Sequence, residues 1–184
     1  TLEITMKTVT PALLALLCTA GAALAQSSPY AGQQARPIKA LSDDDQSALA
    51  QGRGMGFAKT AELNGYPGPM HVVELSQKLE LTPEQRSASE RLMNEHKARA
   101  RDMGAQLIEA ERALDRLFAE RRADAAAVDM ATRRVGELNA TLRAEHLRTH
   151  IAQTALLSPQ QVARYQTLRG YAAAAGHAKP SHHH

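Results

Sequence analysis

The sequence predicts an all-α fold, a long antiparallel helical hairpin with short flanking helices, and three observations lead to it. Hydrophobic residues make up 43% of the 184 residues, but aromatic residues make up only 3%. Such a composition favours helices that pack through small side chains. After Pro83 the chain continues to residue 122 with no further proline and one glycine. Two nearly identical phrases, LTPEQ at residues 81–85 and LSPQQ at residues 157–161, flank the region between them.

The first 25 residues predict a signal peptide, in which the five residues before Met6 come from an over-long assignment of the start. Lys7 is followed by an apolar run over residues 12–25, which ends in a small-residue cleavage site, and we expect cleavage after Ala25. The run is shorter than the ~20 residues that a membrane-spanning helix takes. Export would place the mature chain in the periplasm, and the only cysteine, Cys18, would leave with the signal.

The mature chain begins with a polar segment, residues 26–41, which contains two prolines and predicts a disordered tether. A helical domain is expected over residues 42–172, followed by a flexible, histidine-containing tail over residues 173–184. Within the domain, Ser42 and the three aspartates after it predict a helix start, because they combine a cap with acidic residues in the first turn. A short helix is expected over residues 70–79.

The two phrases are helix-start signals. In each, the hydroxyl residue is an N-cap, the proline takes the first helical position, and the final glutamine can complete a capping box. A leucine stands just ahead of each cap as a hydrophobic staple. The motif residues are Leu81, Thr82 and Gln85 in the first phrase, and Leu157, Ser158 and Gln161 in the second.

Two long helices are predicted between the phrases, from residue 82 to about 122 and from the N-cap Asp124 to about 157, with a last helix over 159–171. Apolar or small residues recur in steps of three and four, and His96 fills one gap. These seam positions are Met93, Ala100, Met103, Leu107, Ala110, Leu114 and Leu117, then Val128, Ala131, Val135, Leu138 and Leu142. The short connection predicts antiparallel packing, and so thin a hairpin predicts a homodimer.

This pattern resembles the Spy/CpxP family of periplasmic stress proteins, also called the LTXXQ motif family, whose relatives include the metal-binding proteins ZraP and CnrX. The first phrase matches the motif fully, and the second has Ser158 where the motif has threonine. The resemblance covers about residues 70–171. It implies a cradle-shaped dimer of hairpins, and the members of the family divide among ATP-independent chaperones, modulators of envelope-stress signalling and metal binders.

We therefore expect a periplasmic, ATP-independent, chaperone-like envelope-stress protein that can also bind a divalent metal. The alternatives are a heavy-metal sensor or resistance protein, and a regulatory partner of a membrane sensor kinase. Unfolded client proteins would be partners, because arginine stems cover apolar surface while their charged heads attract acidic segments. The arginines expected to bind clients are Arg133, Arg134, Arg143 and Arg148.

Histidines inside the predicted fold are the candidate metal ligands. His146 and His150 are four residues apart on one helix, a spacing that can present two imidazoles to one ion. If the hairpin brings its ends together, residues 70–74 (MHVVE) could approach this pair. The predicted metal ligands are His71, Glu74, His146 and His150, with Met70 or Glu145 nearby. Imidazole and carboxylate ligands suit zinc, nickel, cobalt or copper(II).

A structural interpretation of the same histidines stands beside the metal site. His146 and His150 fit partly exposed polar residues on a basic helix, and His96 fits a hydrogen-bonded polar residue of the core. Sensors of the CnrX kind carry a spaced pair of histidines before the first motif and His-x-x-x-Met before the second. This chain has His71 alone and then His-x-x-x-His, which leaves the ligand set open.

The sequence does not favour an enzyme or a nucleic-acid-binding protein. No cysteine follows the predicted signal, and no phrase resembles a nucleophile elbow. The phrase HLRTH lacks the glutamate base of the zinc proteases, because Leu147 takes its place. The net charge is only +3, and few aromatic residues are present to stack on bases. We expect no required cofactor.

Overall fold

The computed structural model describes residues 28–171, so the predicted signal peptide and the histidine-containing tail lie outside the described residues. The chain divides into two compact units, Thr1–Gly32 and Gln33–His184, and every helix of the described range belongs to the second unit. That range contains helices and no strand, which confirms the predicted all-α class. None of these helices is both long enough and apolar enough to cross a bilayer.

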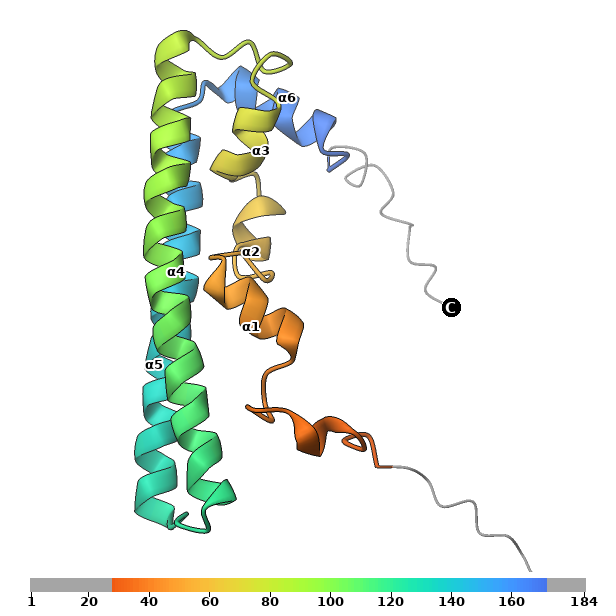
Figure 1. The fold of residues 1–184 in the computed structure, drawn as a ribbon. Helices are drawn as coiled ribbons and strands as arrows, with labels where there is room; N and C mark the ends of the chain where they lie inside the picture. Colours follow the sequence, from red (N-terminus) through yellow and green to blue (C-terminus); the bar gives the residue numbers. More distant parts are fainter. Residues whose placement is uncertain (1–27, 172–184) are drawn as a thin grey trace, which may run out of the picture. The chain divides into compact units, whose positions relative to one another are not determined.

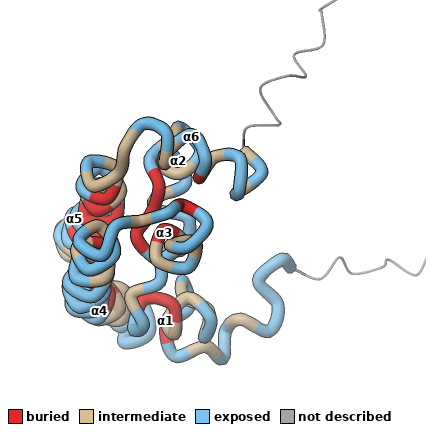
Figure 2. The backbone as a smooth tube through the Cα atoms, turned by 90° about the horizontal axis from the view of Figure 1, so that it is seen from above, coloured by how far each residue is buried: buried red, intermediate tan, exposed pale blue. Residues whose placement is uncertain are grey.

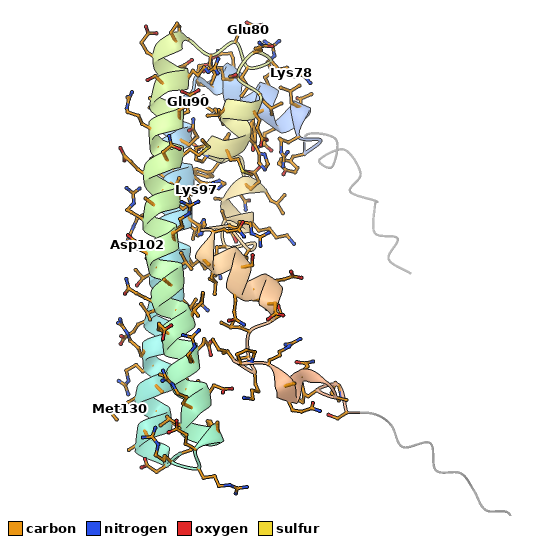
Figure 3. All side chains as sticks on the ribbon, viewed as in Figure 1. Lys78, Glu80, Glu90, Lys97, Asp102 and Met130 are labelled. Atoms are coloured by element: carbon orange, nitrogen blue, oxygen red, sulfur yellow. The ribbon has the colours of Figure 1, made fainter. Side chains whose placement is uncertain are left out.

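The two long helices are α4 (Pro83–Ala119) and α5 (Ala125–Ala155), and they lie antiparallel side by side, as predicted (Figure 1). The turn between them ends at the expected N-cap, because the Asp124 carboxylate accepts a hydrogen bond from the N–H of Ala127. Arg121, with φ of 53°, adopts the left-handed conformation that this reversal requires. The outward faces of the hairpin carry polar and charged side chains along α4 (Figure 3).

The repeated phrases start α4 and α6 (Pro159–Leu168) with complete capping boxes, which confirms their predicted local role. Their glutamines also bond to each other. The Gln85 amide donates to Gln161 Oε1 over 2.9 Å, and the Gln161 amide donates to Gln85 Oε1 over 2.9 Å. The same two amides donate to the backbone carbonyls of Leu156 and Leu79. This glutamine pair, Gln85 with Gln161, therefore joins the two motifs at the open end of the hairpin.

Three short helices form a second layer along the hairpin: α1 (Asp43–Ala50), α2 (Lys59–Glu62) and α3 (Pro69–Glu74) (Figures 1 and 2). Helices α1 and α3 pack on α4, while α2 and α3 also reach α5. The predicted start of α1 is confirmed, because Ser42 and Asp45 form a capping box. Gly52, with φ of 66°, then turns the chain out of the helix.

Helix α3 is shorter than predicted. It ends at Glu74, and residues 75–80 adopt turns instead of continuing the helix to residue 79. Glu80 has φ of 53°, in the left-handed region, so the chain reverses just before the first motif. This turn places the Leu79 side chain, which is 1% exposed, in the core.

The segment before Ser42, predicted as a tether, contains a short 3-10 helix, Gln33–Ala35, and contacts α4. Ile38 is fully buried. The backbone N–H and the side-chain ammonium of Lys39 both donate to the Asp115 carboxylate, over 3.0 and 3.2 Å. The folded contacts of the second unit therefore begin ahead of the first capping box.

Two apolar clusters hold the hairpin and the second layer together. The buried segments lie between these two layers (Figure 2). In the first cluster, the predicted seam residues of α4 and α5 meet Leu49 of α1, which confirms the central part of the seam. In the second, Tyr165 of α6 is fully buried against α3 and the turn after it. The members are Leu49, Ala100, Leu107, Leu138 and Leu142 in the first cluster, and Val72, Leu79 and Tyr165 in the second.

Candidate functional site

The interior of the hairpin changes from apolar to polar toward its open end. Beyond Leu142, the buried positions of α5 are occupied by polar side chains, and Ser89 of α4 is buried opposite them. Buried polar groups cost free energy unless they are hydrogen-bonded, so such a row requires a specific arrangement of partners. The buried polar residues of α5 are Glu145, His146, Thr149 and Gln153.

His96 of α4 lies at the centre of this row. Its Nδ1 is 3.0 Å from Thr149 Oγ1 and 3.3 Å from Glu145 Oε1. The same carboxylate oxygen accepts a hydrogen bond from Arg99 Nε over 2.8 Å. On the other side of the ring, His96 Nε2 is 3.0 Å from His146 Nδ1. The prediction of His96 as a hydrogen-bonded polar residue of the core is therefore confirmed.

His146 is almost completely enclosed, with 4% of its surface exposed. Phe57 stacks on it, with ring centroids 5.5 Å apart, and His96 meets it edge-on. Burial, aided by the neighbouring His96 and His150, lowers the pKa of His146 to about 4. Its Nε2 is buried and has no hydrogen-bond partner among the described residues. The interpretation of His146 as a partly exposed residue is therefore wrong, because the ring lies in the core.

His150 lies one turn further along α5 and contacts the second layer. Its Nδ1 is 2.7 Å from the backbone carbonyl of Tyr66, where the ring nitrogen must donate, and 3.7 Å from Glu62 Oε2. The ring packs so closely on Gly68 that a Cβ there would lie 2.8 Å from His150 Nε2. Helix α3 does contact α5, but the residues against His150 precede α3, so the expected approach of His71 and Glu74 to His150 stays a prediction.

The other two predicted ligands pair with each other on α3. His71 Nδ1 is 2.8 Å from Glu74 Oε2, and both side chains are more open to solvent than His146. The neighbouring Met70 is 52% exposed. Residues 28–171 contain no group of three or more His, Cys, Asp or Glu side chains that could hold a metal ion as they stand. The four-ligand set thus remains a prediction that needs a rearrangement of these side chains.

One feature is shared by His71, His146 and His150. In each ring Nδ1 is engaged by a polar neighbour, and within the described part of the chain no hydrogen bond reaches Nε2. Metal-binding histidines generally have this arrangement, with one nitrogen held by a carboxylate, carbonyl or similar partner and the other left for the metal. The donor set is therefore suited to divalent transition metals.

Sequence reasoning missed Glu62 as a neighbour of His150. Glu62 Oε1 accepts a hydrogen bond from the Tyr165 hydroxyl over 2.6 Å, and burial together with this bond raises the pKa of Tyr165. The carboxylate also lies 3.7 Å from Arg169 Nε. No local pattern marks Glu62, because its neighbours come from α5 and α6, far along the chain.

The four arginines predicted to bind clients are all exposed on α5. None of them makes an ion pair within residues 28–171, unlike Arg86 and Arg164, which pair with Glu90 and Glu80. Their guanidinium groups are therefore open to acidic groups of another molecule. The arginines in question are Arg133, Arg134, Arg143 and Arg148.

Comparison with known proteins gives one match. The model of a family described as heavy-metal resistance matches residues 54–164, more than half of the chain. The matched range runs from the loop before α2 into α6 and contains every predicted metal ligand. The description names resistance to heavy metals and no reaction. No curated protein and no solved structure matches the chain.

Proposed function

Because the chain belongs to the heavy-metal resistance family, we propose that it binds a divalent transition metal through His146 and His150, as a resistance or sensor protein of the bacterial envelope. The observation that carries this proposal is the free Nε2 on His71, His146 and His150, each opposite an engaged Nδ1. Zinc, nickel, cobalt and copper(II) are the candidate ions. The site would be completed by His71 and Glu74.

Metal loading at this site requires local movement. His146 Nε2 is shut off from solvent, and His150 Nε2 faces the backbone of Gly68. The second layer that covers both rings consists of short helices and loops, which open more readily than a long helix does. Movement of this layer would expose the two rings of α5 and change the position of His71. Binding of the metal is thereby coupled to the packing of the second layer on the hairpin.

Removal of His146 and His150 is expected to abolish saturable metal binding. Zinc, nickel, cobalt and copper(II) are each titrated by calorimetry into two proteins, the reference chain and its His146→Ala/His150→Ala variant. Both proteins carry serine at the four tail histidines, His177, His182, His183 and His184, because these could bind metal alone. The reference chain should also melt at a higher temperature with metal present, since a ligand that binds only the folded state stabilises it.

Two further variants sharpen this comparison. His150→Ala alone should weaken metal binding without creating a cavity in the core, because His150 is less deeply buried than His146. If His71 completes the site, His71→Ala should also weaken metal binding, but less than the His146→Ala/His150→Ala double variant does. Equal affinity of the reference chain and the double variant, with both proteins folded by circular dichroism, would disprove the metal site.

A chaperone-like activity is a second proposal, in keeping with the resemblance to the Spy/CpxP family, with a homodimer in the periplasm as its setting. It is supported by the arginines of α5, which form no ion pair within residues 28–171, and by two exposed apolar side chains of the same helix, Met130 and Ile151, which are 69% and 57% exposed. Flexible cationic stems beside apolar patches suit weak, adaptable contacts with unfolded chains. A sensor kinase would be a further partner.

Replacement of the four unpaired arginines by glutamine is expected to slow the capture of an acidic unfolded client, most strongly at low salt. The measurement is the light scattering of an aggregating client, without nucleotide. A matched control variant replaces four ion-paired arginines by glutamine, so its net charge changes by the same amount. These arginines are Arg86, Arg112, Arg122 and Arg164. Equal loss of suppression in both variants would show a general charge effect and count against this surface.

A further inference from the structure

We infer that His96 is a positioning residue: together with Arg99, Glu145 and Thr149, it fixes His146 in the tautomer that carries its proton on Nδ1. The buried Nε2 of His146 is then a bare lone pair. This inference deepens the proposed function, since a lone pair on Nε2 is what a metal ion requires. The tautomer itself is a property of the metal-free protein and can be tested independently.

The chain of hydrogen bonds starts at Arg99. Its Nε donates to Glu145 Oε1 over 2.8 Å, and a guanidinium group can only donate. An acid group that accepts a hydrogen bond from a guanidinium at this distance is held in its carboxylate form. Glu145 is therefore ionised at neutral pH, and both of its oxygens can only accept hydrogen bonds.

Thr149 adds a second acceptor beside His96. Its hydroxyl is 2.9 Å from the backbone carbonyl of Glu145, one turn earlier in α5, and only 3.0 Å from His96 Nδ1. A hydroxyl has one proton, and the carbonyl takes it, so the oxygen of Thr149 accepts from His96. Both neighbours of His96 Nδ1 are thus acceptors, which requires the proton of a neutral His96 to lie on Nδ1.

In the last step, the tautomer of His96 determines the tautomer of His146. At neutral pH an enclosed imidazole carries a single proton, and the two acceptors hold that proton on Nδ1, so Nε2 of His96 carries none. That nitrogen is 3.0 Å from His146 Nδ1, which must therefore donate. The opposite assignment would point the lone pair of His96 Nδ1 at the Glu145 carboxylate. It would also leave a proton on His146 Nε2, where no acceptor exists among the described residues.

The test is the tautomer of His146 in the ¹⁵N-labelled, metal-free full chain, read from long-range ¹H–¹⁵N correlations of the ring at neutral pH. We expect a protonated Nδ1 and an unprotonated Nε2, opposite to the preference of a free histidine side chain. His96→Leu should return His146 to a mixture or to the Nε2–H form. His96→Gln should retain the Nδ1–H form, because the amide oxygen can accept in place of the ring nitrogen.

Amide spectra and melting curves of the variants separate loss of fold from loss of positioning. If His96→Leu does not fold, Thr149→Val serves in its place, since it removes one acceptor at nearly constant shape, and the Nδ1–H population of His146 should fall. A protonated Nε2 in the wild-type chain overturns the inference, as does a folded His96→Leu with an unchanged tautomer. A fixed Nδ1–H tautomer in a chain that binds none of the four metals would uphold this inference while refuting the proposed function.

Discussion

Gly104→Ala is expected to lower the free energy of unfolding by about 3 kcal/mol, because α1 crosses α4 at this position with no room for a side chain. A Cβ on Gly104 would overlap the carbonyl oxygen of Leu49 and lie 2.8 Å from its carbonyl carbon. The obstacle is backbone, which cannot rotate away as a side chain could. Relief requires α1 to shift, and the shift would draw the Leu49 side chain out of the first apolar cluster.

Gly136→Ala is the matched control. Gly136 is the exposed glycine of α5, and a Cβ there would meet nothing within 4 Å. The same chemical change should therefore stabilise the protein by up to about 1 kcal/mol, the helix-propensity difference between the two residues. Urea unfolding followed by circular dichroism measures both. Stabilisation by both substitutions would show that α1 does not pack on Gly104 in solution.

Acidification is expected to destabilise the metal-free protein by roughly 3 kcal/mol between pH 6.5 and 4, from His146 alone. Burial lowers the pKa of this ring from 6.5 to about 4, so in this window the unfolded chain takes up a proton that the folded chain refuses. The unfolded state binds more protons, and stability therefore falls as the pH falls. The groups that face the ring are His96, Glu145 and His150, and the lowered pKa of His96 acts in the same direction.

His146→Leu provides the comparison for this pH dependence. It removes the titrating group and keeps an apolar side chain of similar size against Phe57. The free energy of unfolding of this variant should change less over the same pH range, with the remaining slope due to His96 and to carboxyl groups of lowered pKa such as Glu145. Urea titrations at fixed protein concentration, in the presence of a chelator, give both curves. Parallel curves for wild type and variant would show that His146 is not held neutral by burial.

The helix boundaries were largely predictable because they are coded locally. Ser42, Thr82, Asp124 and Ser158 each cap a helix as the sequence predicted, since a cap depends on residues within one turn of it. The end of α3 was not predicted. It depends on the burial of Leu79 beneath α6, a contact between segments far apart in the chain.

The candidate site was predicted only in part, for the same reason. The spacing of His146 and His150 gave their common helix face, but it did not show that one ring lies in the core and the other against Gly68. His96 was recognised as a polar seam residue, yet its partner could not be named from the sequence. Whether it meets Leu142, His146 or Thr149 depends on how far one helix is displaced along the other.

The glutamine pair, Gln85 with Gln161, limits this displacement of one helix along the other. A helical hairpin fastened only at its turn can shift by one turn, ~5.4 Å, and exchange one set of neighbours for the next. Here Gln85 and Gln161 also join the opposite end, through two reciprocal hydrogen bonds between their side-chain amides. The covalent turn at one end and the glutamine pair at the other together oppose a shift of α4 along α5. The amide pair thus helps the apolar seam to keep the imidazoles of His96 and His146 in register, although it forms no hydrogen bond with either ring in the described part of the chain.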